Sequence, residues 1–419
     1  MTDLQCLGKN AKQAAASIAR LSENTINKTL MTAAKFLREN AKFLIEENTA
    51  DIDAARSKGM TDAFIDRLTL NEKVIDGMAV GLEQVAGLKS PVGKVLYSHE
   101  NDEQGISIVK KAVPFGVVGI IYESRPNVTA DAFALCFKTS NAVILKGGSD
   151  SLRSNVAIVN VLKKALGECG VDKNAISIIE DTSRETTAEF MRLNKYVDLL
   201  IPRGGASLIK AAVENSTIPI IETGTGNCHV YVDKSADLNM AAEVIFNAKT
   251  QRYSVCNACE SLVVHSAILE KALPLIAARL KEKEVEIRAD ERAFEVLKDY
   301  PFISTATEED FYTEYGGAII SVKTVDSEDE AIAHVNEHST HHSESIITAD
   351  NEAAEKFLNA IDSSSVYLNA STRFTDGFVF GLGAEIGIST QKLHARGPMG
   401  LDALVTSKYY VIGNGSVRK

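Results

Sequence analysis

The chain has 419 residues, a formal net charge of −11 at pH 7 and 24% charged residues, so it is long enough for two or three domains with a sizeable core. The acidic balance argues against non-specific binding to nucleic acid or to an anionic membrane surface. No signal-peptide core opens the chain, and no apolar run approaches the roughly 18 residues of a membrane span. The expected location is the cytoplasm. The six cysteines are far apart and do not form a disulfide framework.

Residues 1–90 are predicted to be helical and to pack on a later core, because apolar residues recur at helical spacing between charged ones. A β-hairpin is predicted next, at 94–113, where two β-prone runs flank the polar segment 100–105. Its faces alternate only weakly between apolar and polar residues. We therefore expect the hairpin to project and to pair with another subunit.

Short apolar runs then alternate with helical stretches, which is typical of parallel sheets covered by helices on both faces. The first block has such runs at 116–121, 142–145, 176–179, 198–201 and 218–221. The second block has them at 230–232, 261–264, 318–322, 345–348 and 366–368, and the tail could add one more strand. The fold class is therefore α/β, with a dinucleotide site expected at the carboxyl ends of the strands.

Two glycine-rich turns are the candidates for phosphate binding. The usual G-x-G-x-x-G fingerprint is absent, since the glycines from Gly381 onward have the wrong spacing and come late. One candidate turn is Lys146-Gly-Gly-Ser149 and the other is Arg203-Gly204-Gly205, each between a predicted strand and a helix. Either turn could be purely structural, but two in one sheet favour a dinucleotide.

Cys256 is the candidate nucleophile. It follows a polar loop that carries Lys249, Gln251 and Arg252, and nearby positive charge favours a reactive thiolate. The alternative for a single cysteine is a small buried apolar residue. The spacing to Cys259 would also allow a redox dithiol or half of a zinc site, but no matching ligands follow, so no metal is expected.

The segment 369–400 is rich in glycine, hydroxyls and cations, and long ordered loops are usually functional. Within it Arg373, His394 and Arg396 could bind a carboxylate or a phosphate, with a solvated loop as the alternative. The histidines at 334, 338, 341 and 342 lie in a polar, Glu-rich stretch, and a solvated surface is expected for them.

Several motifs together resemble the aldehyde dehydrogenase superfamily. They are 118–127 with its Glu-Ser-Arg-Pro-Asn, the Lys146 turn, Glu222, Cys256 and 314–317, in this order. The longer motifs at 226–229, 247–252, 369–377 and 393–398 are similar to the branch that reduces an acyl phosphate of glutamate. One departure concerns Glu222, which is followed by Thr-Gly-Thr-Gly-Asn where hydrolytic members have Leu-Gly-Gly-Lys. Another is Cys259, for which we expect a packing role.

The resemblance implies an aldehyde dehydrogenase-like fold in three parts: a Rossmann-type cofactor domain, an α/β catalytic domain and a β-hairpin oligomerisation element. The implied boundaries are 1–93 and 114–226 for the cofactor domain, with 368–404 returning to it, 227–367 for the catalytic domain, and 94–113 with 405–419 for the oligomerisation element. A homo-oligomer, a dimer or higher, is expected.

The resemblance also implies an activity. It is the NADPH-dependent reduction of L-glutamyl 5-phosphate to L-glutamate 5-semialdehyde and phosphate, the second step of proline biosynthesis, with glutamate 5-kinase as a possible partner. Cys256 would form a thioester, while Asn127 and the Cys256 N–H would stabilise the oxyanion. A Glu at position 149 would repel the 2′-phosphate of NADP, whereas Ser149 does not.

The remaining roles follow from the same resemblance. Lys146 and Glu314 would hold the cofactor riboses, and Gly204 with Gly205 would open the helix on the pyrophosphate side. Substrate binding would fall to four cationic residues, namely Arg125, Arg373, His394 and Arg396.

Overall fold

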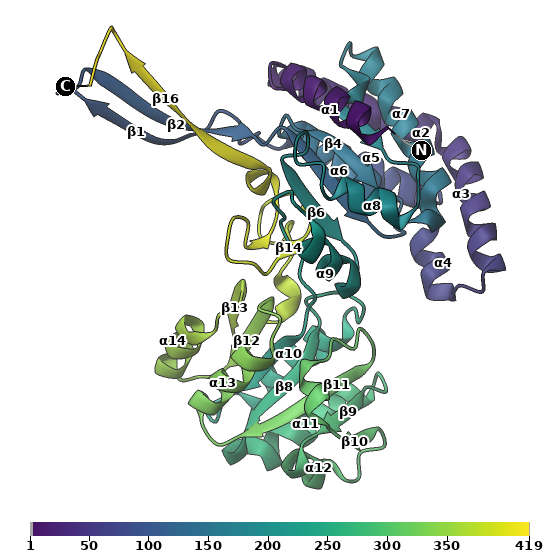
Figure 1. Ribbon diagram of the computed structural model, residues 1–419. Coiled ribbons are helices and arrows are strands. Elements are labelled where there is room, and N and C mark those ends of the chain that lie inside the picture. Colours follow the sequence, from purple (N-terminus) through teal and green to yellow (C-terminus); the bar gives the residue numbers. More distant parts are fainter. Residues whose placement is uncertain (1–2, 419) are drawn as a thin grey trace. The chain divides into compact units, whose positions relative to one another are not determined.

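The computed structural model describes residues 3–418 and divides into two compact units (Figure 1). The first unit runs to Glu222 and also contains Leu382–Gly387 and the residues from Met399 onward. The second unit comprises Thr223–Gly381 and Ile388–Pro398. In each unit a parallel sheet is combined with helices, so the predicted α/β class is confirmed.

The first unit opens with five helices, which confirms the helical prediction for residues 1–90. They are α1 (Leu4–Ile18), α2 (Glu23–Glu39), α3 (Ala41–Ser57), α4 (Asp62–Leu68) and α5 (Glu72–Gly87). Polar side chains cap four of them by accepting a hydrogen bond from a first-turn N–H, namely Asp3, Ser22, Thr61 and Asn71. Their buried apolar faces pack on the sheet or on the helices that follow it.

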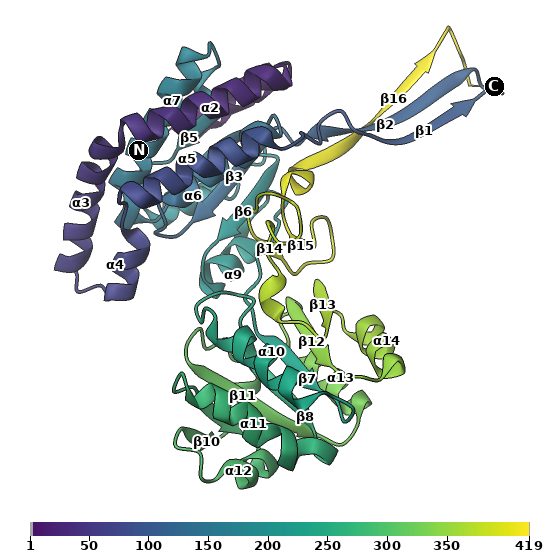
Figure 2. The same cartoon turned by 180° about the vertical axis from the view of Figure 1, so that it is seen from behind.

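The sheet of the first unit has four parallel strands in the order β5-β4-β3-β6. These are β3 (Val117–Tyr122), β4 (Ala142–Lys146), β5 (Ile176–Ile178) and β6 (Leu199–Arg203). The helices between and after them are α6 (Asn127–Lys138), α7 (Leu152–Glu168), α8 (Arg184–Phe190) and α9 (Ala206–Asn215). Figure 2 shows α2 and α5 beside α6, and the three helices contact one another. Every residue of β3 and β4 is buried, as expected for a sheet covered on both faces.

One predicted strand is not formed. The run at 218–221 makes a single bridge, between Ile220 and Leu200, and no named strand. Pro219 lies in the middle of this run and has no N–H to give to a ladder, which explains why pairing stops after one bridge.

A separate antiparallel sheet joins the predicted hairpin to the tail of the chain. It consists of β1 (Val95–Asn101), β2 (Ile106–Pro114) and β16 (Val405–Gly413) in the order β1-β2-β16. All but one residue of β1 and all but one of β16 are exposed. The hairpin and the extra strand are thus confirmed, while the pairing with another subunit stays a prediction.

The second unit has a sheet of seven parallel strands in the order β10-β9-β11-β8-β7-β12-β13. They are β7 (Cys228–Val232), β8 (Cys259–His265), β9 (Glu286–Ala289), β10 (Ile303–Thr305), β11 (Ile319–Val325), β12 (Ser343–Ile347) and β13 (Ser365–Leu368). Its helices are α10 (Leu238–Thr250), α11 (Leu269–Lys281), α12 (Glu291–Leu297), α13 (Glu328–His338) and α14 (Asn351–Ala360).

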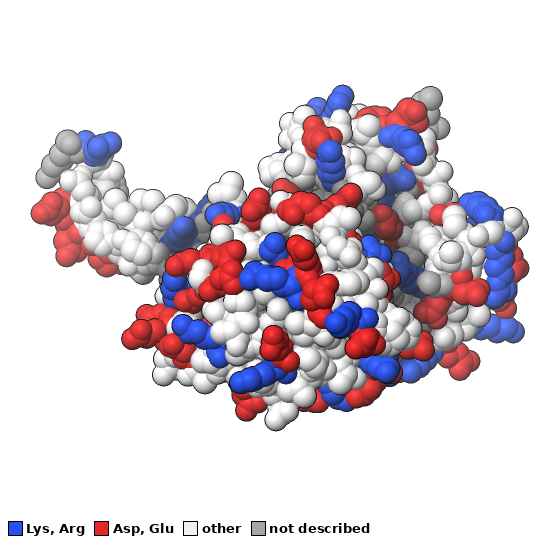
Figure 3. Space-filling model, turned by 90° about the horizontal axis from the view of Figure 1, so that it is seen from below, with Lys and Arg blue, Asp and Glu red and all other residues white. Residues whose placement is uncertain are grey.

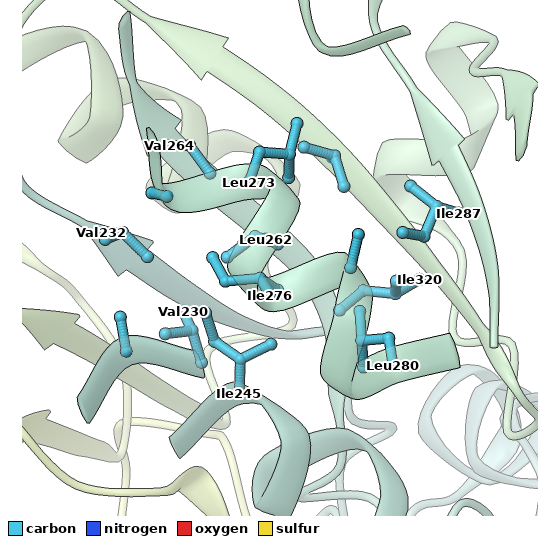
Figure 4. Close-up of a cluster of buried hydrophobic side chains, with 14 of the residues drawn as sticks. Val230, Val232, Ile245, Leu262, Val264, Leu273, Ile276, Leu280, Ile287 and Ile320 are labelled. Atoms are coloured by element: carbon cyan, nitrogen blue, oxygen red, sulfur yellow. The ribbon is translucent and has the colours of Figure 1, made fainter. Parts of the chain in front are cut away.

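Alternate residues of the strands supply two hydrophobic clusters in this unit. Val230 and Val232 join the larger cluster with Leu262 and Ile276 (Figure 4), while Tyr231, between the two valines, joins the smaller one. Successive side chains of a strand point to opposite faces, so the two clusters lie on opposite faces of the sheet.

The segment 368–404 is divided between the units, which differs from the expected return of the whole segment to the cofactor domain. Residues up to Gly381 and Ile388–Pro398, with the short pair β14 (Ile388–Ser389) and β15 (Gly397–Pro398), belong to the second unit. Hydrogen bonds hold the start of the segment there: Thr348 N–H donates to Asn369 Oδ1, at 2.9 Å.

Acidic and basic side chains are interspersed over the face shown in Figure 3, so the negative charge is not gathered into one patch there. Among the described residues, no helix combines the length and the apolar character that crossing a bilayer would require.

Candidate active site

Cys256 lies in the loop between α10 and β8 of the second unit and is partly exposed. Cys259 opens β8, is fully buried and belongs to the larger hydrophobic cluster. Burial raises the pKa of the Cys259 thiol to about 12, so it is neutral at physiological pH. The packing role expected for Cys259 is confirmed, and of the two thiols Cys256 is the one that a substrate can reach.

Hydrogen bonds from a distant segment fix the nucleophile loop. The Asn257 side-chain amide donates to the carbonyl oxygens of Thr375, at 2.8 Å, and Arg373, at 3.3 Å. In return, the Thr372 hydroxyl donates to the Asn257 carbonyl at 2.7 Å. Asn257 is buried, so these bonds are shielded from water and hold the residue after Cys256 against the 372–375 turn.

An irregular glycine-rich segment, 223–226, lies against the backbone of Cys256, and the sequence analysis missed its role. A Cβ on Gly226 would overlap the carbonyl oxygen of Cys256, and one on Gly224 would overlap the Thr390 side chain. The thiol of Cys228 also donates to the Cys256 carbonyl at 3.2 Å. The signal was present in the Thr-Gly-Thr-Gly run, where alternate glycines indicate close backbone approach.

Lys249 was expected to contribute free positive charge to the loop, and the structure shows that it does not. It is fully buried, and its Nζ lies 2.5 Å from Glu260 Oε2, also fully buried. Burial raises the pKa of Glu260 to about 7, against the lowering effect of Lys249. Glu260 Oε1 accepts from Gly316 N–H at 3.3 Å, so the pair links α10, β8 and the 314–317 loop.

Arg373 is the sequence-predicted cation that the structure brings to Cys256. Burial lowers the pKa of Arg373, while the negative charge of a Cys256 thiolate raises it and Arg252 lowers it. The guanidinium Nε donates to Gln251 Oε1 at 2.9 Å, which anchors it to the same loop. A cation in this position favours the thiolate form of a nearby cysteine.

Arg396 and His394 have different surroundings. Arg396 forms a salt bridge of 2.9 Å with Asp362, which Lys392 also contacts. Hydrogen bonds from Lys392 and Arg396 lower the pKa of Asp362 to about 2. His394 is exposed on a turn with a φ of 39°. The positive charge of Arg396 is therefore paired with the carboxylate of Asp362.

Glu314 follows a short 3₁₀ helix and accepts a hydrogen bond from the Gly226 backbone N–H. Glu314 is exposed overall, yet partial desolvation of its carboxyl group by the surrounding protein raises its pKa. The hydrogen bond from Gly226 and the charge of Lys249 lower it. The cofactor candidate Glu314 therefore shares Gly226 with the nucleophile loop.

The other predicted residues belong to the first unit, at the carboxyl edge of its sheet. Lys146 ends β4, with Ser149 beginning the next 3₁₀ helix, and Gly204 and Gly205 lie between β6 and α9. Arg125 and Asn127 follow β3. Residue pairs Ile121–Lys146 and Tyr122–Arg203 lie side by side in the sheet, so these three strand ends meet at one edge. Cofactors bind at this edge of parallel sheets.

Lys146 fits a phosphate or ribose ligand. Its side chain is buried, and its Nζ contacts the neighbouring Gly147 carbonyl at 3.5 Å, with no carboxylate within 4.0 Å among residues 3–418. Burial lowers the pKa of Lys146, although the charge of Asp181 opposes this. A buried ammonium with weak partners is costly, and an anionic or hydroxyl ligand would relieve that cost.

Glu123 is a further residue that the sequence analysis missed. Its Oε1 accepts from the Gly205 N–H at 2.9 Å, so a carboxylate takes the first donor of α9. A Cβ on Gly204 would lie 2.7 Å from the same carboxyl group. Helix N-termini attract anions, and here the anion is a side chain of the chain itself.

The expectation of solvated histidines was wrong for three of the four. His334, His338 and His342 are buried, and the first two rings stack at 4.1 Å. Burial lowers the pKa of His334 to about 2 and that of His342 to about 4. Positions 334 and 338 are one helical turn apart and face the sheet with Val335, so the helical period of α13 placed them inside.

The comparisons agree with this geometry. A model described as "Aldehyde dehydrogenase family" matches residues 2–295 and 302–387. The gamma-glutamyl phosphate reductase of Lachnospira eligens is 54% identical over 419 residues, with 100% of both chains covered. That of Listeria monocytogenes is 51% identical over 418 residues, again with 100% of both covered.

Solved structures give the same result. The crystal structure of gamma-glutamyl phosphate reductase from Thermotoga maritima has a TM-score of 0.97 at 46% identity, with 100% of both chains covered. An acetylating aldehyde dehydrogenase from Geobacillus thermoglucosidasius has a TM-score of 0.70 at 18% identity, covering 100% of this chain and 98% of its own, and shares the fold.

Proposed function

The chain belongs to the aldehyde dehydrogenase family, and from this premise we propose that it reduces L-glutamyl 5-phosphate to L-glutamate 5-semialdehyde and phosphate with NADPH. It is an oxidoreductase that acts on a small-molecule substrate and uses a nicotinamide cofactor. The observation that carries the proposal is the partly exposed Cys256 in a loop that hydrogen bonds hold in place, with Arg373 near enough for its charge to interact with the thiolate.

The proposed chemistry begins with the Cys256 thiolate, which attacks the acyl carbon of the substrate. The bond from that carbon to the phosphate oxygen breaks, phosphate leaves with the electron pair, and a thioester remains. The cofactor, when bound, supplies the hydride that reduces the thioester. Collapse of the resulting thiohemiacetal releases the aldehyde and restores the thiol.

The main task of the surrounding groups is to stabilise negative charge on the thiolate, the substrate and the oxyanion. Arg373 supports the thiolate before attack and suits an anionic substrate. The backbone N–H of Cys256 and the amide of Asn127 are predicted to donate to the oxyanion, and Arg125 to bind substrate. Arg396 is bound to Asp362, so we assign it a smaller share of substrate binding than Arg373.

The test is an assay of the reverse reaction, NADP reduction with glutamate semialdehyde, with and without phosphate. Attack of phosphate on the thioester should make NADP reduction depend on phosphate, and sulfate at the same ionic strength should not replace it. The rival function is an aldehyde dehydrogenase that releases the free acid by hydrolysis. Equal rates without phosphate, with glutamate as the product, would favour that rival.

Ser149 provides a test of cofactor preference. We expect NADP to be used in preference to NAD, because no carboxylate stands at position 149 and Lys146 lies three residues before it. The neighbouring charges are paired, Arg153 with Glu47 and Lys58 with Asp150. In Ser149→Glu the preference should shift toward NAD by roughly tenfold or more, since like charges a few ångströms apart repel strongly at a protein surface.

The readout for Ser149 is kcat/KM for NADP and for NAD in the parent and the variant. Ser149→Gln is the matched control, with similar size and no charge, and it should keep most of the NADP preference. An unchanged ratio in Ser149→Glu would contradict the placement of the 2′-phosphate at this turn.

We also propose that the β1-β2-β16 sheet joins subunits. Leu96 and Tyr97 are each 50% exposed, and Val411 and Ile412 are 59% and 62% exposed, so both outer strands present apolar side chains. Such edges promote aggregation unless a partner covers them. Deleting residues 97–106 should convert the oligomer to monomers in light scattering.

A point variant keeps that test from depending on the deletion alone. Ile412→Glu should weaken assembly in the same direction, while an intact thermal transition shows that the first unit is still folded. A parent protein that is already monomeric at micromolar concentration would refute the proposal.

A further inference from the structure

Helix α6 carries one acidic residue on an otherwise buried surface. From Thr129 to Lys138 every residue except Asp131 is buried, and most are apolar. Asp131 is the only carboxylate of the helix. It stands four positions after Asn127, the first residue of α6, so the two side chains lie on the same face one turn apart.

The two side chains are in contact. Asn127 Nδ2 donates to Asp131 Oδ2 at 3.4 Å. A carboxylate accepts hydrogen bonds only, so the nitrogen of the carboxamide, and not its oxygen, must face Asp131. This bond takes one of the two N–H groups of Asn127. It favours one orientation of the amide and leaves the second N–H available as a donor.

The surroundings make this carboxylate unfavourable as a packing residue. Asp131 keeps part of its surface exposed, yet desolvation by the surrounding protein raises its pKa to about 6, and the Asn127 hydrogen bond and the charge of Arg203 only partly offset that effect. On the side of α5, a Cβ at Gly81 would lie 3.6 Å from Asp131 Oδ1, so the helices are close there. An apolar residue at this position would avoid the desolvation.

We propose that Asp131 is a positioning residue that orients the Asn127 carboxamide for hydrogen-bond donation to the oxyanion of the reaction intermediate. This inference rests on the proposed function and on the predicted role of Asn127. Asp131 acts through Asn127 and does not itself contact the reacting atoms. The competing explanation is a structural anchor for Arg203, which would not depend on Asn127.

A double-mutant cycle separates the two explanations. Asn127→Ala should lower kcat by about 10²–10³-fold, as loss of one oxyanion donor does. Asp131→Asn keeps the size but allows either end of the Asn127 amide to face position 131, and misorientation should lower kcat by about 10- to 100-fold. In the Asn127→Ala background the same change at 131 should cost less than about twofold, because nothing remains to be oriented.

Two controls accompany the cycle. Glu168→Gln, an exposed site on α7, removes the same charge and should leave kcat unchanged. Alkylation of Cys256 by iodoacetamide passes through no oxyanion, so its rate should be the same in Asp131→Asn as in the parent. An intact thermal transition excludes simple unfolding.

The outcomes are distinct. The inference is overturned, and the function stands, if Asn127→Ala lowers kcat but Asp131→Asn does not. The same holds if Asp131→Asn lowers kcat by the same factor in the parent and in the Asn127→Ala background. If the parent shows no phosphate-dependent NADP reduction, the proposed function fails. Crystal structures of parent and Asp131→Asn at atomic resolution, where the amide nitrogen and oxygen can be told apart, then decide the inference alone, and an Asn127 side chain in the same orientation in both would overturn it.

Discussion

Replacing Cys256 by alanine is expected to abolish turnover, with a loss on the order of 10⁵-fold or more, because the covalent route has no other nucleophile. Cys259→Ala is expected to keep most of the activity. Its thiol is buried in the hydrophobic cluster, where burial raises its pKa to about 12, so the change removes packing and not chemistry. The stability cost should be about 1 kcal/mol.

The measurements are initial rates at saturating substrate and the thermal midpoint for both variants. A third measurement is the pattern of iodoacetamide labelling at neutral pH, read by peptide mass, in which Cys256 should be modified before Cys259. An equal loss of activity in the two variants would instead revive the dithiol interpretation of the Cys-x-x-Cys spacing.

Gly226→Ala is expected to have the second largest effect. Even one methyl group at this position would overlap the carbonyl oxygen of Cys256, which is backbone and cannot rotate away. Either the 223–227 segment or the nucleophile loop must move, and Gly226 N–H also donates to Glu314. A displacement of about 1 Å at a reacting group can lower kcat by roughly 10²-fold, so a loss of that size or larger is expected.

Gly77→Ala is the matched control for Gly226→Ala. Gly77 is an exposed residue inside α5, and an added Cβ would meet nothing within 4 Å. Alanine in a helix interior should stabilise the protein by about 0.5–1 kcal/mol relative to glycine. Normal kcat in Gly226→Ala with an unchanged melting midpoint would show that the close approach to Cys256 is not needed.

Several features follow from local sequence patterns. Helical periodicity identified the N-terminal layer, and alternating runs identified the two parallel-sheet blocks, although the run at 218–221 forms only one bridge and β9 and β10 were not predicted. The long motifs identified Cys256, and the resemblance to the family, with Cys259 as a departure from its pattern, predicted a packing role for that residue. These succeed because period and turn chemistry depend on residues that are neighbours in the chain.

Other features were decided by tertiary structure. Lys249 was predicted to add free charge to the nucleophile loop, yet Glu260, eleven residues later, neutralises it across a buried contact. Three histidines in a polar stretch are buried, because the period of α13 and the position of β12 turned them inward. Charge and burial thus depend on residues that only the fold brings together.

The close approach of Gly226 to Cys256 and the bond from Asn127 to Asp131 belong to the same class. The sequence by itself determined which residue types were available: a thiol, glycines, an amide and a carboxylate four positions apart. Whether a glycine is required, or an amide is oriented, depends on distances of a few ångströms between backbone and side-chain atoms. Those distances are set when strands and helices pack into a dense core, and no local pattern encodes them.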